Sequence, residues 1–138
     1  MSEHDARQRP LEYPAKYLQG LKLFNDEEFF ACHDALEEVW TETVGEEKQF
    51  YQGLIHAAVS LFHFENGNLG GARKMHASSL KYLEPYGRHY LGIDVEAFAA
   101  QLWFCFKELR EATEASANLQ LDRSLIPKIP MPNEAQER

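Results

Sequence analysis

Apolar residues recur at helical spacing along nearly the whole chain, and no segment shows the strict alternation that predicts a strand. The most apolar stretch is YQGLIHAAVSLFHF at residues 51–64, and the segment LWFCF at 102–106 is apolar on every side of a helix. A helix of that kind is normally enclosed by others, so we expect 102–106 to be deeply buried. The pattern predicts five helices, over residues 11–23, 26–43, 46–65, 68–83 and 95–115.

Two of the predicted helix starts carry capping signals. Asn25 is followed three residues later by Glu28, which approximates a capping box, and Asp94 is a suitable cap for the last helix. Phe24 and Phe29 flank the first of these caps at the spacing of a hydrophobic staple. We therefore expect the second helix to begin directly after Asn25.

The chain divides into three parts by composition. Residues 1–9 are polar and carry both signs of charge, so we expect a disordered tail and not a signal peptide. Residues 10–116 hold the predicted helices, whose short connections favour one bundle of antiparallel neighbours. Residues 117–138 contain three prolines within six positions and are expected to be extended, whether or not they pack on the bundle. The predicted fold is thus all-α, a single-domain bundle with a Pro-rich C-terminal tail.

The net charge and the hydrophobicity of the chain argue against two classes of binding partner, nucleic acids and membranes. Its 138 residues include 14 Lys and Arg against 22 Asp and Glu, which gives a formal net charge of −8. Such an acidic chain is a poor partner for nucleic acid, which is bound by clustered basic side chains. No stretch approaches the ~20 apolar residues of a membrane span. We therefore expect neither nucleic acid nor a membrane as a partner.

The two cysteines are consistent with a cytoplasmic protein. Cys32 and Cys105 both lie in apolar helical segments, where a thiol usually behaves as a small hydrophobic side chain. A disulfide framework in a secreted protein would require more of them. We therefore predict two buried free thiols and a cytoplasmic location.

Polar side chains interrupt the apolar faces of the second and third helices. At about 100° per residue, His33, Glu37 and Trp40 fall within one narrow arc of the second helix. They share this face with the apolar residues Phe29, Phe30 and Leu36. The third helix carries a similar polar strip, roughly three turns long. If these two helices pack as antiparallel neighbours, the strips meet inside the bundle. The candidate ligand or pocket residues are His33, Glu37, Trp40, Gln52, His56 and His63.

Buried groups of this kind need partners, because an unpaired buried carboxylate or imidazole costs several kcal/mol. One resolution is a self-contained hydrogen-bonded network between Glu37 and the histidines. A second is a divalent metal ion held by His33, Glu37 and His63. Glu37 would then be a ligand or the general base of a hydrolase, and Gln52 would orient a ligand. A third is a small polar ligand held between the helices. In each case Asp34 is expected to point away from this face, toward the side of the helix.

Three further positions bear on packing. Trp40 is more simply a core residue than a platform for a ligand. Gly53 favours a close helix crossing, because it has no side chain to hold a neighbouring helix away. His76 shares a stripe with apolar residues of the fourth predicted helix, so we expect it to face inward as well.

Several ordered motifs resemble a bacterial and archaeal family. They are Phe24-Asn25, then His33, Glu37 and Trp40 in the pattern His-x-x-x-Glu-x-x-Trp, then Gln52-Gly53-Leu54-Ile55, and last Gly67-Asn68 with Gly71-Ala72. The segment from Tyr17 to Leu83 resembles the family known as domain of unknown function 309. The resemblance implies an all-α intracellular protein and no particular reaction, since the family has none established. The residues that match the family pattern are His33, Glu37, Trp40, Gln52 and His63, whereas the family usually has Gln at the position of His56.

Two hypotheses of function follow. In the first, the interior polar groups bind a divalent metal ion or a small polar ligand, and metal-dependent hydrolysis is the natural chemistry. In the second, the same residues form a buried network in a non-enzymatic module, which acts by oligomerisation or by binding a protein through an aromatic surface. A homo-oligomer is compatible with both hypotheses.

Overall fold

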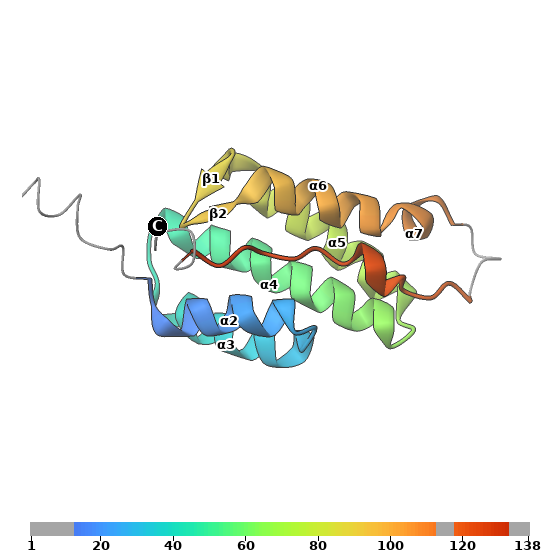
Figure 1. Ribbon diagram of the computed structural model, residues 1–138, viewed down its shortest axis with the longest axis horizontal. Helices are drawn as coiled ribbons and strands as arrows, with labels where there is room; N and C mark the ends of the chain where they lie inside the picture. The colour runs from blue at the N-terminus through green and yellow to red at the C-terminus, as the bar shows by residue number, and fades with distance from the viewer. Residues whose placement is uncertain (1–12, 113–117, 133–138) are drawn as a thin grey trace, which may run out of the picture.

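The computed structural model describes residues 13–112 and 118–132, and these are mostly helical (Figure 1). The predicted all-α class is therefore confirmed. The N-terminal tail predicted at 1–9 and the boundary predicted between 116 and 117 lie outside the described residues. The helices are α2 (Ala15–Asn25), α3 (Phe29–Glu42), α4 (Glu46–Glu65), α5 (Leu69–Leu83), α6 (Val95–Cys105) and α7 (Lys107–Glu111), with the 3-10 turns η1 (Glu84–Tyr86) and η2 (Arg123–Leu125).

One short hairpin was not predicted. Strand β1 (His89–Tyr90) pairs with β2 (Ile93–Asp94) in antiparallel register. The turn between them uses Leu91 at φ 46° and Gly92 at φ 84°. Each strand has only two residues, which is too short for the alternation of apolar and polar residues that indicates a strand. The sequence therefore carries no strand signal here.

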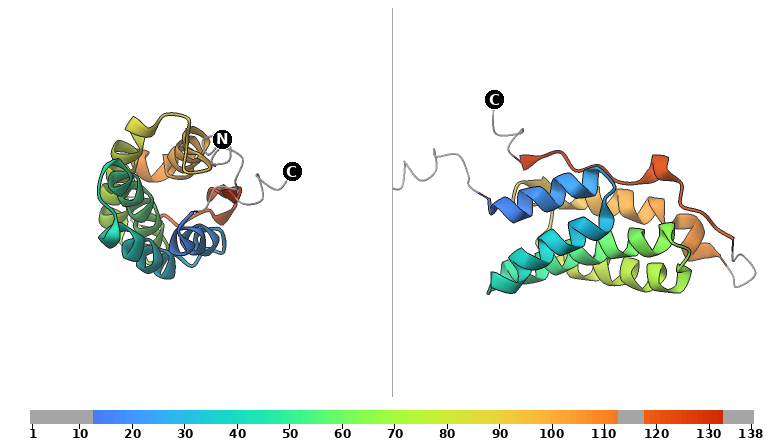
Figure 2. Two further views of the ribbon diagram at one scale, coloured as in Figure 1. Left: turned by 90° about the vertical axis from the view of Figure 1, so that its left-hand side faces the viewer. Right: turned by 90° about the horizontal axis from the view of Figure 1, so that it is seen from below.

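The helices form an arc around a shared core. Helices α2 to α5 pack in chain order, and α6 follows them (Figure 2). The C-terminal segment 118–132 runs along the open side of the arc, between α2 and α6. None of the helices in the described ranges is long and apolar enough to cross a membrane. The largest fully buried side chains include Tyr17, Phe24, Phe29, Phe50 and Phe106.

The junction between α2 and α3 corrects the predicted cap. Helix α2 extends to Asn25, so this residue ends one helix instead of beginning the next. The chain then reverses through Glu27 at φ 63°, and Glu28 precedes α3 without a side-chain capping bond. The expected contact of Phe24 with Phe29 is present, with ring centroids 5.3 Å apart in an edge-to-face arrangement.

The starts of the fourth and fifth predicted helices are confirmed. Asn68 precedes α5, and its side chain accepts a hydrogen bond from the backbone N–H of Gly71 at 3.0 Å. Asp94 caps α6 in the same way, through the N–H of Ala97 at 2.9 Å. Each cap satisfies a backbone donor that the first helical turn leaves unpaired. The third predicted helix also has its expected bounds, as α4.

The apolar segment 102–106 is not uniformly buried, contrary to the prediction. Leu102 and Phe106 are 0% exposed, but Trp103 is 52% and Phe104 57% exposed. The reason is that α6 lies at one end of the arc, where only one of its sides faces other helices (Figure 2). The helix also breaks at Phe106, where φ is −96° and ψ is 10°, and α7 follows. Its predicted end at 115 lies outside the described residues.

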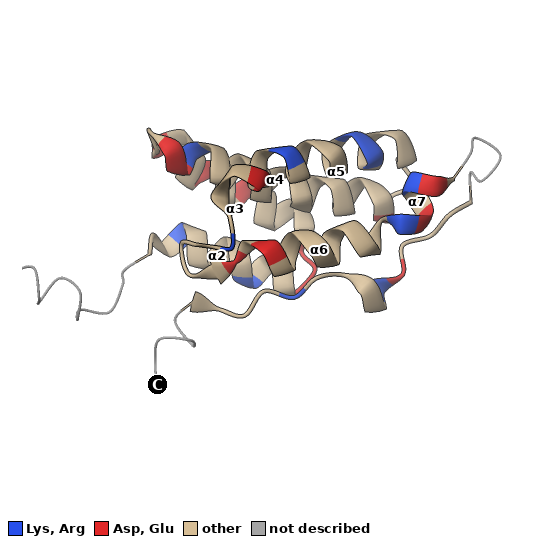
Figure 3. Cartoon of the chain, turned by 90° about the horizontal axis from the view of Figure 1, so that it is seen from above, with Lys and Arg blue, Asp and Glu red and all other residues tan. Residues whose placement is uncertain are grey.

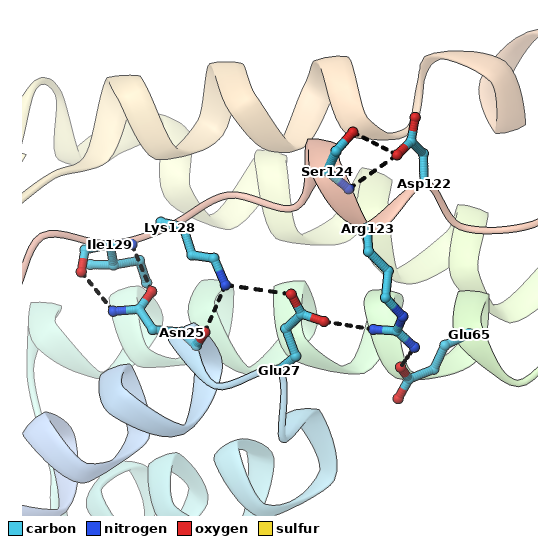
Figure 4. A network of polar contacts seen from close by, with 8 residues as sticks. All are labelled: Asn25, Glu27, Glu65, Asp122, Arg123, Ser124, Lys128 and Ile129. Carbon is cyan, nitrogen blue, oxygen red and sulfur yellow. Dashed lines mark hydrogen bonds and ion pairs between the residues drawn. The ribbon is translucent and has the colours of Figure 1, made fainter.

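The C-terminal segment packs on the bundle. Ile129 is 4% exposed, and the side-chain amide of Asn25 forms two hydrogen bonds with its backbone, a pair that we call the Asn25 clamp (Figure 4). Asn25 Nδ2 donates to the carbonyl oxygen of Ile129, and Asn25 Oδ1 accepts from its N–H, each at 2.7 Å. Arg123 adds ion pairs to Glu27 at 2.8 Å and Glu65 at 2.7 Å. The clamp explains why Asn25 stands at the end of α2.

Removing the clamp is expected to loosen this segment. We expect Asn25→Ala to lower the free energy of unfolding by about 2 kcal/mol, because it deletes two partly buried hydrogen bonds. Urea unfolding followed by circular dichroism measures the effect. The control is Asn66→Ala, which deletes one exposed hydrogen bond to Phe62 and should change stability by less than about 0.5 kcal/mol. Equal effects of the two substitutions would contradict the clamp.

Candidate functional site

Two of the polar residues predicted to face the interior from α3, His33 and Glu37, lie toward its outer side. The side chains of His33 and Glu37 are 24% and 52% exposed, so the predicted interior location is wrong for Glu37 and only partly right for His33. The physical reason is rotational, because the direction shared by the buried residues of α3 is roughly 90° from His33 on the helix. Those buried residues are Phe29, Cys32, Ala35, Leu36 and Val39.

Three polar side chains of α3 converge at this outer side, and we call His33, Asp34 and Glu37 the α3 cluster. His33 Nδ1 lies 3.2 Å from Asp34 Oδ1, and His33 Nε2 lies 3.7 Å from Glu37 Oε2. One ligand atom from each residue lies within 4.8 Å of the others. Asp34, predicted to point aside, is therefore part of the group. A His at one position and a Glu one turn later share a helix face, and Asp34 reaches the ring from the adjacent position.

The Nδ1 atom of His33 is shielded from solvent. No hydrogen bond of acceptable geometry to this atom is found within the part of the chain that the structure describes. The contact with Asp34 is close enough for an ion pair but does not have hydrogen-bond geometry. The cluster therefore contains a ring nitrogen whose bonding capacity is incompletely used.

His63 is separated from this cluster by two aromatic rings. Phe30, which is 56% exposed, lies between His33 and Phe62, with ring-centroid distances of 5.7 Å and 5.5 Å. The Phe62 ring is a further 6.1 Å from that of His63. His63 Nδ1 instead lies 3.3 Å from Asn68 Nδ2, at the start of α5. The predicted ligand set of His33, Glu37 and His63 is therefore not brought together.

Gln52 and His56 belong to a separate contact between α4 and α5. His56 Nε2 lies 2.7 Å from Gln52 Nε2. On the other side of the ring, His56 Nδ1 lies 2.7 Å from Ser78 Oγ. If Gln52 donates to Nε2, the neutral ring carries its proton on Nδ1 and donates to Ser78. Burial lowers the pKa of His56, which favours this neutral form. Each polar group then has a partner, so this pair of contacts is structural.

Trp40 packs against the edge of the core, as expected for a core residue. The Nζ atom of Lys48 lies 3.9 Å from the centre of its ring and donates a hydrogen bond to the Trp40 carbonyl oxygen at 2.8 Å. A cation above an indole face is favourable, and here it links the end of α3 to the start of α4. Trp40 has a structural contact of its own, apart from the α3 cluster.

His76 faces inward, as predicted, and is only 2% exposed. Its ring stacks on Phe106 at 4.2 Å between centroids and 4° between planes. Neither ring nitrogen has a hydrogen bond within the described ranges. Burial, with a smaller contribution from the charge of Arg110, lowers the pKa of His76 to about 4. His76 is therefore a neutral, stacked core side chain at ordinary pH.

Both cysteines are buried free thiols, as predicted. Burial raises the pKa of Cys32 to about 12, and burial together with Asp122 raises that of Cys105 to about 12. Because the thiolate is the nucleophile and the metal ligand, neither side chain is suited to those roles.

The comparisons with known proteins agree with the motifs. A family model described as a domain of unknown function (DUF309) matches residues 17–75. The chain is 35% identical over 86 residues to the uncharacterized protein YpuF of Bacillus subtilis (strain 168), a match that covers 59% of this chain and 49% of that protein. An uncharacterized protein of Aquifex aeolicus (strain VF5) is 46% identical over 46 residues, or 33% of this chain and 14% of that protein.

The matched part of the chain contains the α3 cluster. Residues 17–75 include α3 and α4 completely, whereas the chain as a whole spans about half the length of YpuF (49%) and a smaller part of the Aquifex protein. Residues 17–75 thus match the family described as a domain of unknown function (DUF309), the family that the sequence motifs resemble.

Proposed function

We propose that the chain binds a divalent transition-metal ion at the α3 cluster, on the outer surface of the bundle. The observation that carries this proposal is the convergence of one ligand atom each from His33, Asp34 and Glu37 within 4.8 Å. One imidazole and two carboxylates form a donor set that zinc and similar ions accept. All three donors come from one helix, so its backbone sets their spacing.

Modest side-chain rotations would complete the donor geometry. Donors bonded to zinc at about 2.1 Å in a tetrahedral arrangement are about 3.4 Å apart. His33 Nε2 and Glu37 Oε2 are 3.7 Å apart, so the donor atoms must move closer together to share an ion. The carboxylates of Asp34 and Glu37 are 58% and 52% exposed, so both can turn toward a common ion. The His33 ring, at 24% exposure, is the anchored member. Its Nδ1 lacks a hydrogen bond among the described residues, and an ion would give one of its nitrogens a full partner.

A site with three protein donors leaves at least one coordination position open. Water or a small polar ligand would occupy that position. Metal-dependent hydrolysis is the chemistry that an open position supports. Glu37 is either the third ligand or, where His33 and Asp34 alone hold the ion, the candidate catalytic residue as general base. The hydrolase activity is a proposal that depends on metal binding.

Calorimetric titration of the protein with zinc chloride at neutral pH tests the metal site. We expect one ion bound per chain. His33→Ala should weaken binding by about 100-fold or more, because it removes the only nitrogen donor of the cluster. Asp34→Asn and Glu37→Gln should each weaken it by about 10- to 100-fold, whether the carboxylate is a ligand or orients the imidazole.

Two histidines outside the α3 cluster serve as controls. His63→Ala and His56→Ala should leave zinc affinity unchanged within about twofold, since their rings contact Asn68 and Ser78 instead. Absence of saturable binding, or equal binding by wild type and His33→Ala, would contradict the proposal. A loss of affinity in both His33→Ala and His63→Ala would favour the ligand set predicted from the sequence.

The second hypothesis, a non-enzymatic interaction module, has support from a different surface. The buried network that it assumed does not fit a Glu37 side chain that is 52% exposed. Binding through an aromatic surface, however, fits the exposed rings of Trp103 and Phe104 on α6.

A further inference from the structure

Helix α6 presents an aromatic face to solvent whose own side chains are uncharged, and the guanidinium of Arg110 on α7 lies over one of its rings, 3.2 Å from the centre of Trp103. From residue 97 to residue 106 the chain has no charged side chain, and Figure 3 shows the body of α6 without blue or red. Trp103 and Phe104 are 52% and 57% exposed on this face, and Ala100 is exposed beside them. A chain with a net charge of −8 has few such surfaces available, since 36 of its residues are charged.

A hollow lies beside this face, between α5 and α6. It has a volume of about 520 Å³. Its apolar lining consists of Leu80, Leu83, Val95, Ala99, Ala100 and Trp103, and the charged residues Lys81, Glu84 and Glu96 also line it. The two alanines open the first half of α6, while the large rings stand on the second half. The face is therefore hollow at one end and raised at the other.

We propose that this face binds the same face of a second copy of the chain, with the two α6 helices antiparallel about a twofold axis between Gln101 and Leu102. In this register, Ala100 lies opposite the partner's Trp103, and Ala99 opposite the partner's Phe104. Because an antiparallel pair keeps the α5 side of both copies together, each Trp103 reaches the other copy's hollow. The raised end of each face thus fits the hollow end of the other.

The charges that flank the uncharged run identify the partner as a second copy. Glu96 precedes the run and Lys107, the first residue of α7, follows it, and both are exposed. In the same antiparallel register each Glu96 lies opposite the partner's Lys107, so the dimer gains two opposite-charge pairs. Elsewhere the two copies, each at −8, repel one another. This inference is independent of the proposed metal site, which lies on α3.

Charge exchange tests the register. Sedimentation velocity over a range of protein concentrations should show a monomer–dimer equilibrium for the wild type. Glu96→Lys and Lys107→Glu should each raise the dimer dissociation constant by about tenfold or more, because each places like charges opposite one another twice. An equimolar mixture of the two variants should form a heterodimer, because opposite charges then face one another again at both ends of the paired helices.

Two controls keep the result specific. Lys74→Glu makes the same charge change at an exposed position of α5 and should leave the dissociation constant unchanged within about twofold. Circular dichroism should show the wild-type helix content for every variant. A wild type that is monomeric at all concentrations would overturn the proposal, as would variants that dimerise like the wild type. A mixture that stays monomeric would overturn the antiparallel register.

Discussion

Lowering the pH from 7 to 4 is expected to reduce the free energy of unfolding by about 3 kcal/mol through His76. The ordinary pKa of 6.5 applies to the unfolded chain, whereas burial lowers the pKa in the folded protein to about 4. The unfolded state therefore takes up the proton first as the pH falls. The stability that the neutral ring provides is fully present above pH 6.5 and is lost progressively toward pH 4.

The cause of this pH dependence is the packing around the ring. His76 is 2% exposed, stacks on Phe106 at 4.2 Å, and has no hydrogen bond to either nitrogen among the described residues. A proton on the ring would leave a charge without a partner in the core, and the nearby Arg110 has the same sign. No hydrogen bond among the described residues would stabilise the charged form.

Urea unfolding at a series of pH values measures the effect. His76→Leu should remove most of the loss between pH 7 and pH 4, because leucine has no proton to bind. The control is His89→Gln, which changes an exposed histidine of β1 and should leave the slope of stability against pH close to that of the wild type. Identical slopes for the wild type and His76→Leu would contradict the assignment.

Gly53→Val is expected to destabilise the protein by about 3 kcal/mol, because it adds atoms where α4 and α5 cross closely. A methyl group placed on Gly53 would lie 2.6 Å from Leu83 Cδ2 and 3.2 Å from Tyr82 Cβ. Leu83 is 1% exposed, and its Cγ also lies 2.8 Å from the added methyl group, so the whole end of its side chain would have to shift. The hydrogen bond from Ser79 Oγ to the Gly53 carbonyl, at 2.7 Å, shows how near the two helices lie. This crossing is the one that the sequence predicted.

A second glycine provides the matched control for this prediction. Gly70 lies in the first turn of α5 with nothing within 4 Å of an added methyl group. Gly70→Ala should therefore leave stability unchanged or raise it by up to about 1 kcal/mol, since alanine favours helix. Thermal unfolding of both variants gives the comparison. If Gly53→Val is as stable as Gly70→Ala, the close crossing does not constrain the fold.

The sequence predicts where the helices begin and end better than it predicts which side of each helix is buried. Periodicity and caps were sufficient for α4 and for the starts of α5 and α6, because those signals are local. The prediction that Asn25 caps the second helix failed because the partner of its side chain, Ile129, is more than a hundred positions away. Ile129 belongs to an extended segment without periodicity, so no local pattern indicates the contact. The exposure of Trp103 likewise depends on the place of α6 at the end of the arc, which no local pattern contains.

The candidate site shows the same limit. The pairing of His33 with Glu37 followed from helical spacing, and the structure retains it at 3.7 Å. Its interior location did not follow, because counting the exposed Phe30 as a core residue rotated the expected core face of α3 toward His33. Asp34 was missed for the same reason, since from the wrong face it pointed aside. His63 required knowledge of which rings lie between α3 and α4, and only the packed structure supplies it.

Elemental analysis of untagged protein purified without chelator, with His33→Ala alongside, tests the central claim most directly. The claim is that the α3 cluster holds a divalent metal ion. It predicts a nearly stoichiometric transition metal in the wild type and its loss in His33→Ala, while circular dichroism shows both proteins folded. Equal metal content in the two proteins, whether high or absent from both, would contradict it.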